Sequence, residues 1–175
     1  MVFVNKPLDI MLDEIEFGRL IRYDYHIPAE CPDRYCFCGE RLDILDQSDP
    51  NYVVNIVKDL IPELREQVSD GGFYIADAIE LALENAFSRG NCLDTHLPVS
   101  VKVFSGRKGH VIRIRDSGMG FNYRKKIKQM RSKEYGYAKN FGQGLLALDE
   151  PGFEASYENR GSTLNIMIPN PCPEA

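Results

Sequence analysis

The run HVIRIRDSGMG, residues 110–120, decides the fold of this chain. Its first half alternates β-branched and polar residues, which predicts a half-buried strand that ends near Asp116. The Asp116 carboxylate can accept a hydrogen bond from an exocyclic amino group. Gly118 and Gly120 carry no Cβ, so the backbone can turn sharply there and let a flat base lie against it. Because glycines after a strand more often mark a plain turn, the interpretation depends on accompanying motifs.

Three further motifs accompany this run in a fixed order. Residues 75–91 (IADAIELALENAFSRGN) predict an amphipathic helix that carries Asn85. Residues 140–148 (NFGQGLLAL) place two glycines before a short helix, and residues 161–168 (GSTLNIMI) form a last strand. The combination resembles the GHKL (Bergerat-fold) ATP-binding superfamily of gyrase and the histidine kinases. Over roughly residues 41–168, the chain is most similar to the small anti-sigma-factor serine kinases of that superfamily.

The order of elements predicts an α+β fold, a two-layer sandwich with helices on one face of a mixed, mostly antiparallel sheet. We expect an ATP-binding domain over residues 41–170, with its lid at about 122–143, and an N-terminal extension with cysteines over residues 1–40. Alternating patterns predict one hairpin from residues 99–116 and another from residues 153–168. A strand at 41–46 and a helix that begins near Pro50 are expected to precede the Asn85 helix.

The helix with Asn85 has a buried stripe and places Asn85 at its edge. At about 100° per residue, the residues of the stripe are Ile75, Ile79, Leu83, Ala86 and Phe87. The resemblance implies that the Asn85 amide oxygen ligates Mg²⁺, which prefers hard oxygen donors and bridges the phosphates of ATP. A hydrogen-bonded asparagine with a structural role is the alternative interpretation.

The position of the catalytic base departs from the family. Relatives that hydrolyse ATP or phosphorylate serine carry a Glu four residues before this Asn, and here that residue is Leu81. The nearest carboxylates, Glu80 and Glu84, point about 140° and 100° away from Asn85. A general base needs hydrogen-bond reach, so both are weak catalytic candidates. Nucleotide binding is better supported than phosphoryl transfer, and a serine/threonine protein kinase or weak ATPase activity stays open.

Four other residues complete the ATP site that the resemblance implies. Gly142 and Gly144 precede a helix, where free backbone N–H groups can bind phosphate. Thr163 would share a water network with Asp116 under the adenine, although a β-branched residue on a strand usually faces the core. Asn122 either places an amide near the phosphates or caps a helix.

The charge is unevenly distributed. Segment 124–139 has seven Lys or Arg residues and a single Glu, a net charge of +6, which leaves −11 for the rest of a chain whose net charge is −5. Such a run is often a solvated face. Its position in the expected lid would let the cations face the phosphates or an acidic partner. The isoelectric point near 5.3 argues against nucleic acid as the ligand.

Composition favours one cytoplasmic domain. The 175 residues suffice for a single core, and neither a membrane-spanning apolar run nor a signal peptide is present in the sequence. The odd number of cysteines favours a reducing compartment. Those in the extension have spacings that do not match zinc knuckles, so we expect free thiols. The five cysteines are Cys31, Cys36, Cys38, Cys92 and Cys172.

Two functions from different classes follow. The first is an ATP·Mg²⁺-binding protein that regulates a protein partner, a sigma factor or an anti-sigma antagonist, and that could act as a homodimer without nucleic acid or membrane. The alternative is a degenerate GHKL-fold interaction module without significant nucleotide binding. A detached histidine-kinase catalytic domain is a weaker third reading, since the chain lacks a dimerisation helix pair and a phosphorylatable His motif.

Overall fold

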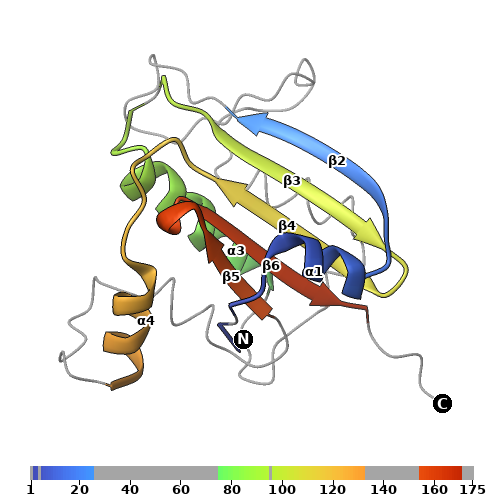
Figure 1. Ribbon diagram of the computed structural model, residues 1–175. Helices are drawn as coiled ribbons and strands as arrows, with labels where there is room; N and C mark the ends of the chain where they lie inside the picture. Colours follow the sequence, from blue (N-terminus) through green and yellow to red (C-terminus); the bar gives the residue numbers. More distant parts are fainter. Residues whose placement is uncertain (1, 4, 26–74, 95, 133–153, 171–175) are drawn as a thin grey trace.

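The computed structural model describes residues 2–3, 5–25, 75–94, 96–132 and 154–170 (Figure 1). The strand expected at 41–46, the helix expected from Pro50, and the glycines Gly142 and Gly144 lie outside these residues. The described elements are β1 (Val2–Phe3), α1 (Leu8–Glu14), β2 (Phe17–Tyr25), α3 (Ile75–Asn85), β3 (Val99–Gly106), β4 (Gly109–Arg115), α4 (Tyr123–Ser132), β5 (Glu154–Glu158) and β6 (Thr163–Pro169).

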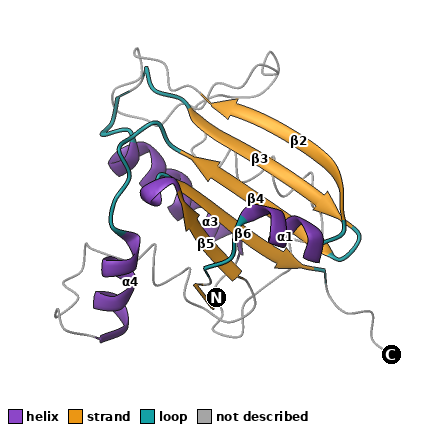
Figure 2. Cartoon of the chain, in the orientation of Figure 1, coloured by secondary structure: helices purple, strands orange, loops and turns teal. Residues whose placement is uncertain are grey.

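The described strands form a six-stranded sheet in the order β1-β5-β6-β4-β3-β2 (Figure 2). All neighbouring strands are antiparallel except β1, which runs parallel to β5. The expected α+β class and the mixed, mostly antiparallel sheet are therefore confirmed. Both expected hairpins are present as β3–β4 and β5–β6, because local alternation and tight turns specify such pairs directly.

Both edges of the described sheet come from the first 25 residues. In β1, Val2 pairs with Glu154, and in β2, Tyr25 pairs with Val99. Within the expected N-terminal extension over residues 1–40, β1 and β2 belong to the sheet and α1 packs against it. The pairing partners lie far along the chain, which is why local sequence patterns did not indicate this role.

The two faces of the sheet are covered by different helices. Side chains alternate along a strand, so Phe104, Val111 and Met167 share one face of the sheet. There they pack against Met11 of α1 and against Ile15, which follows the helix. Helix α3 lies behind the opposite face (Figure 1). The prediction that the helices cover a single face is therefore wrong for α1. A seven-residue helix after Pro7 gives too short a periodic signal to assign a face from sequence.

The stripe predicted for the Asn85 helix is buried throughout. Each of its large apolar side chains contributes about 1.5–3 kcal/mol when fully buried, so this stripe holds α3 against the sheet. The buried residues are Ile75, Ile79, Leu83, Ala86 and Phe87. No helix among the described residues is long and apolar enough to cross a bilayer.

Strand β6 is buried on both faces and carries one unusual polar residue. Asn165 is fully buried, and among the described residues neither its Oδ1 nor its Nδ2 has a hydrogen-bond partner. It shares the α1 face with Met167 and lies in register between Arg113 of β4 and Ser156 of β5. A buried amide without partners destabilises a fold, so Asn165 offers a direct test of the packing under α1.

Candidate functional site

The end of β4 meets the end of α3 at two glycines. Helix α3 continues into a π-helical turn, Ala86–Gly90, in which the Asn91 N–H donates to the Ala86 carbonyl at 2.9 Å. A Cβ on Gly90 would overlap the Asp116 carboxyl group, and a Cβ on Gly118 would overlap the Gly90 carbonyl. The wide turn and the bare glycines thus let the Asp116 loop lie directly on the helix end. Such π-turns are frequent at functional sites.

The Asn91 side chain stabilises the contact between the Asp116 loop and the end of α3. Its Nδ2 donates to the Leu97 carbonyl at 2.8 Å, and its Oδ1 accepts a hydrogen bond from the Ser117 N–H at 2.8 Å. The side chain is almost fully buried. Sequence reasoning did not single out Asn91, because an asparagine after the glycine that ends a helix is typical of an ordinary helix terminus.

Asp116 holds a carboxylate in a partly desolvated corner. Its Oδ1 accepts a hydrogen bond from the Gly118 N–H at 2.9 Å, and its own N–H donates to the Ser162 carbonyl at 3.1 Å. Burial raises the pKa of Asp116, and the Gly118 hydrogen bond opposes that rise. An ionised carboxylate has about four acceptor positions, so the group can accept from a ligand donor as well.

Three aromatic rings pack together at Tyr157 of β5. The Tyr157 ring contacts Phe121 edge-on, with 5.3 Å between ring centroids, and Tyr123, with 5.4 Å between centroids and 31° between ring planes. Burial raises the pKa of Tyr157, and the nearby charge of Asp116 raises this pKa further. The Tyr157 phenol and the Asp116 carboxyl group therefore interact electrostatically.

Two left-handed glycines shape the loop that carries Phe121. Gly120 has φ +73° and Gly161 has φ +94°, values that favour glycine. Their bare Cα atoms let the two loops approach until the Phe121 N–H donates to the Arg160 carbonyl at 2.7 Å. The expected turn after Asp116 is thus locked to the β5–β6 turn.

Asn85 is the last residue of α3 and is half-buried. The helix is regular from Ile75 to Asn85, and the π-turn begins only afterwards. Leu81 therefore stays on the Asn85 side of the helix, as the sequence predicted. Glu84 is exposed, and Glu80 lies within α3. Within the described residues, no group of three or more His, Cys, Asp or Glu could hold a metal ion.

Two expected ligand residues have other hydrogen-bond partners. Asn122 caps α4, since its exposed side-chain Oδ1 accepts from the Lys125 N–H at 3.0 Å. This is the capping alternative left open by the sequence. Thr163 is buried, and its hydroxyl accepts from the Asn159 Nδ2 at 3.0 Å. The neighbouring Ser162, which sequence reasoning did not select, provides the contact to Asp116.

The site thus combines a half-buried acceptor, Asp116, with backbone segments that glycines hold at close approach. A half-buried carboxylate can accept a hydrogen bond from an amino group at the edge of a ligand. A scan against protein-family models and a search of curated proteins found no match for the chain.

Proposed function

We propose that the chain is an ATP·Mg²⁺-binding domain of the GHKL (Bergerat-fold) type that regulates a protein partner. The observation that carries the proposal is the Asp116 carboxyl group, which lies against Gly90 and accepts from the Gly118 N–H. An adenine amino group would donate to this carboxylate. Guanine has a carbonyl oxygen at the corresponding edge and would face it with a second acceptor.

The raised pKa of Asp116 sets the pH dependence of this recognition. The carboxyl group accepts two hydrogen bonds well only when it is ionised, and burial shifts the loss of its proton to higher pH than in an exposed Asp. Adenine binding should therefore weaken as the pH falls through the pKa of Asp116. A site that relied on backbone contacts would not show this dependence.

The nucleotide serves regulation rather than rapid turnover in this proposal. Leu81 occupies the position of the general base on the Asn85 side of α3, and a positioned base contributes typically about 10²–10⁴-fold to a rate. Mg²⁺ would bind Asn85, and the phosphates would bind the expected glycines Gly142 and Gly144. The partner would be a protein of the sigma-factor or anti-sigma antagonist type, and slow phosphorylation of its serine residues is compatible with this arrangement.

Calorimetric titration of the full chain with ATP, GTP and adenosine in Mg²⁺ tests the proposal. We expect ATP to bind more tightly than GTP, and Asp116→Asn to weaken ATP by about 1–3 kcal/mol, because a donor amide then faces the adenine amino group. Asp94→Asn is the matched control, since Asp94 is exposed and its Oδ1 accepts a hydrogen bond from the nearby His96 backbone N–H. Absence of ATP binding at millimolar concentration, or equal affinity for ATP and GTP, would contradict the proposal.

Asn85→Ala tests the metal ligand separately. If Asn85 binds Mg²⁺, this change weakens ATP in the presence of Mg²⁺ and leaves adenosine affinity nearly unchanged. An equal loss for ATP and adenosine would show that Asn85 acts through the structure of the helix end.

A second candidate is a GHKL-fold interaction module that has lost nucleotide binding. Leu81 favours it, because a module without turnover has no use for a carboxylate at that position. This candidate predicts no heat with any nucleotide, together with binding of a protein partner that Asp116→Asn leaves unchanged.

A further inference from the structure

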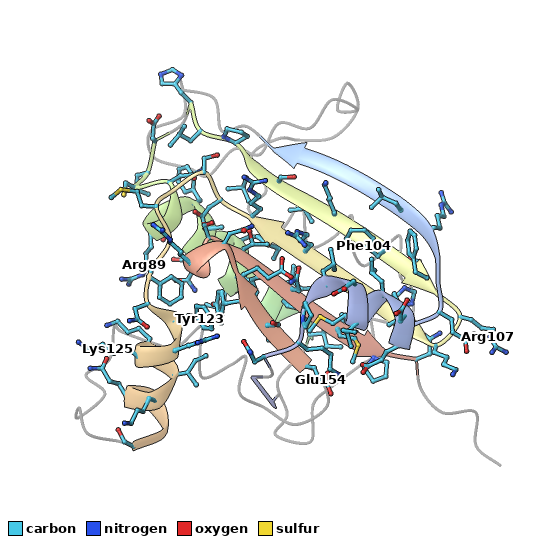
Figure 3. The ribbon with its side chains drawn as sticks, in the orientation of Figure 1. Arg89, Phe104, Arg107, Tyr123, Lys125 and Glu154 are labelled. Carbon is cyan, nitrogen blue, oxygen red and sulfur yellow. The ribbon has the colours of Figure 1, made fainter. Side chains whose placement is uncertain are left out.

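Helix α4 presents a strongly basic surface. Its exposed side chains include Arg124, Lys125, Lys126 and Lys128, and the sequence YRKKIKQMRS contains no acidic residue. The helix stands away from the sheet, with Lys125 on its outer side (Figures 1 and 3). Like charges at these spacings destabilise a helix, so a bound anionic group would stabilise α4.

Three basic residues outside α4 pair with carboxylates. Arg107 and Lys108 both pair with Glu16, at 2.5 and 2.8 Å, and Arg113 pairs with Glu158 at 2.9 Å. The three lysines of α4 differ from these. Among the described residues, no carboxylate lies within ion-pair distance of any of them.

Exposed apolar side chains lie immediately before this helix. Met119 is 97% exposed and Phe121 is 39% exposed, on the loop that leads into α4. Protein-binding surfaces commonly combine an apolar centre with a polar rim. We define the Met119–Lys128 surface as Met119, Phe121, Lys125, Lys126 and Lys128.

We infer that the Met119–Lys128 surface docks an acidic segment of a protein partner, with an apolar side chain of that segment against Met119 and Phe121. The inference deepens the partner half of the proposed function and does not require nucleotide binding. A bound phosphate would pair with the lysines but would leave the Met119 and Phe121 side chains exposed to water. A segment with both acidic and apolar residues matches all five side chains.

The dimensions and charge favour a short protein segment over nucleic acid. Ten residues of α4 span about 15 Å, and surface charges interact over about 10 Å at 0.1 M salt. An extended polyanion would leave α4 and meet the rest of the chain, which carries the acidic excess. A short acidic segment would contact α4 without that repulsion.

Fluorescence anisotropy with a labelled peptide tests this docking. The probe is a glutamate-rich peptide with one central phenylalanine, and the protein is the full chain. We expect Lys125→Gln/Lys128→Gln to weaken binding about tenfold, since two exposed ion pairs are lost. The matched control is Arg107→Gln/Lys108→Gln, which changes the net charge equally at the β3–β4 turn (Figure 3), and it should change affinity less than about twofold. Circular dichroism verifies that both variants fold.

A second pair of measurements tests the apolar anchor. Met119→Ser should weaken the phenylalanine peptide by several-fold and leave a peptide with alanine at that position unchanged. Equal effects on both peptides would overturn the anchor and with it the docking geometry.

Three further outcomes would overturn the inference. They are absence of peptide binding at low salt, an equal loss in the α4 variant and the control variant, and tighter binding of a single-stranded oligonucleotide that the α4 variant loses. Separate measurements on the full chain distinguish this inference from the nucleotide proposal. If calorimetry shows no ATP binding while the peptide still binds to α4, the nucleotide proposal fails and the docking surface stands. Asp116→Asn should leave peptide binding unchanged.

Discussion

Replacement of Asn91 by alanine tests whether the Asp116 loop depends on a single side chain. The variant loses two short hydrogen bonds, to the Leu97 carbonyl and from the Ser117 N–H, and a longer one of 3.4 Å to the Pro98 carbonyl. Each normal bond contributes about 0.5–1.5 kcal/mol net, and an unsatisfied buried partner raises the loss. We therefore expect Asn91→Ala to lower the free energy of unfolding by about 2–4 kcal/mol.

Urea denaturation measures this change. With a slope of roughly 1–3 kcal/mol per molar urea, the midpoint should fall by about 1 M or more while the slope stays constant. Asn5→Ala is the control, because Asn5 is exposed and accepts a hydrogen bond from an exposed arginine side chain. A loss below about 0.5 kcal/mol in Asn91→Ala, comparable with a typical surface substitution, would refute the assignment of Asn91 as the residue that fastens the loop.

Three further predictions concern stability. Burial raises the pKa of Asp116, so its protonated form stabilises the fold fully below the pKa of the unfolded chain, and this stabilisation is lost as the pH rises through the folded pKa. Asp116→Asn should therefore raise the urea midpoint at pH 7 relative to wild type. An equal gain at pH 3 would contradict this. Gly118→Ala should lower the free energy of unfolding by about 1–3 kcal/mol, because its Cβ would overlap the Gly90 carbonyl; Gly18→Ala, where a Cβ meets only a carbonyl oxygen at 3.9 Å, should be tolerated in the same urea assay. Asn165→Leu should stabilise the fold by about 1–3 kcal/mol, because it removes an amide without partners, and an unchanged or lower melting temperature would show that the amide is satisfied by ordered water.

Features encoded by local sequence were predictable. The 3.6-residue period identified the buried stripe from Ile75 to Phe87, and alternation with turn glycines identified both hairpins. The position of Asp116 at a strand end followed from the same alternation. Each of these depends on residues within a few positions of one another, where side-chain periodicity carries the information.

Features that depend on distant contacts were not predictable from the same patterns. The placement of α1 on the opposite face depends on Phe104, Val111 and Met167, which lie about ninety or more positions away from Met11. The role of Asn91 depends on Leu97 and on Ser117, so no local pattern distinguishes it from an ordinary helix terminus.

The origin of both sheet edges in the first 25 residues has a consequence for the order of folding. Val2 pairs with Glu154 and Phe17 pairs with Gly106, whereas β3 and β4 pair across a tight turn. During synthesis, which proceeds from the N-terminus, β1 and β2 emerge before β5 and β3, the strands with which they pair. Contacts of this range slow folding, so β1 and β2 stay unpaired on the nascent chain until those partners have been made. A chaperone that binds nascent apolar segments would therefore meet β1, α1 and β2 before any other part of the sheet.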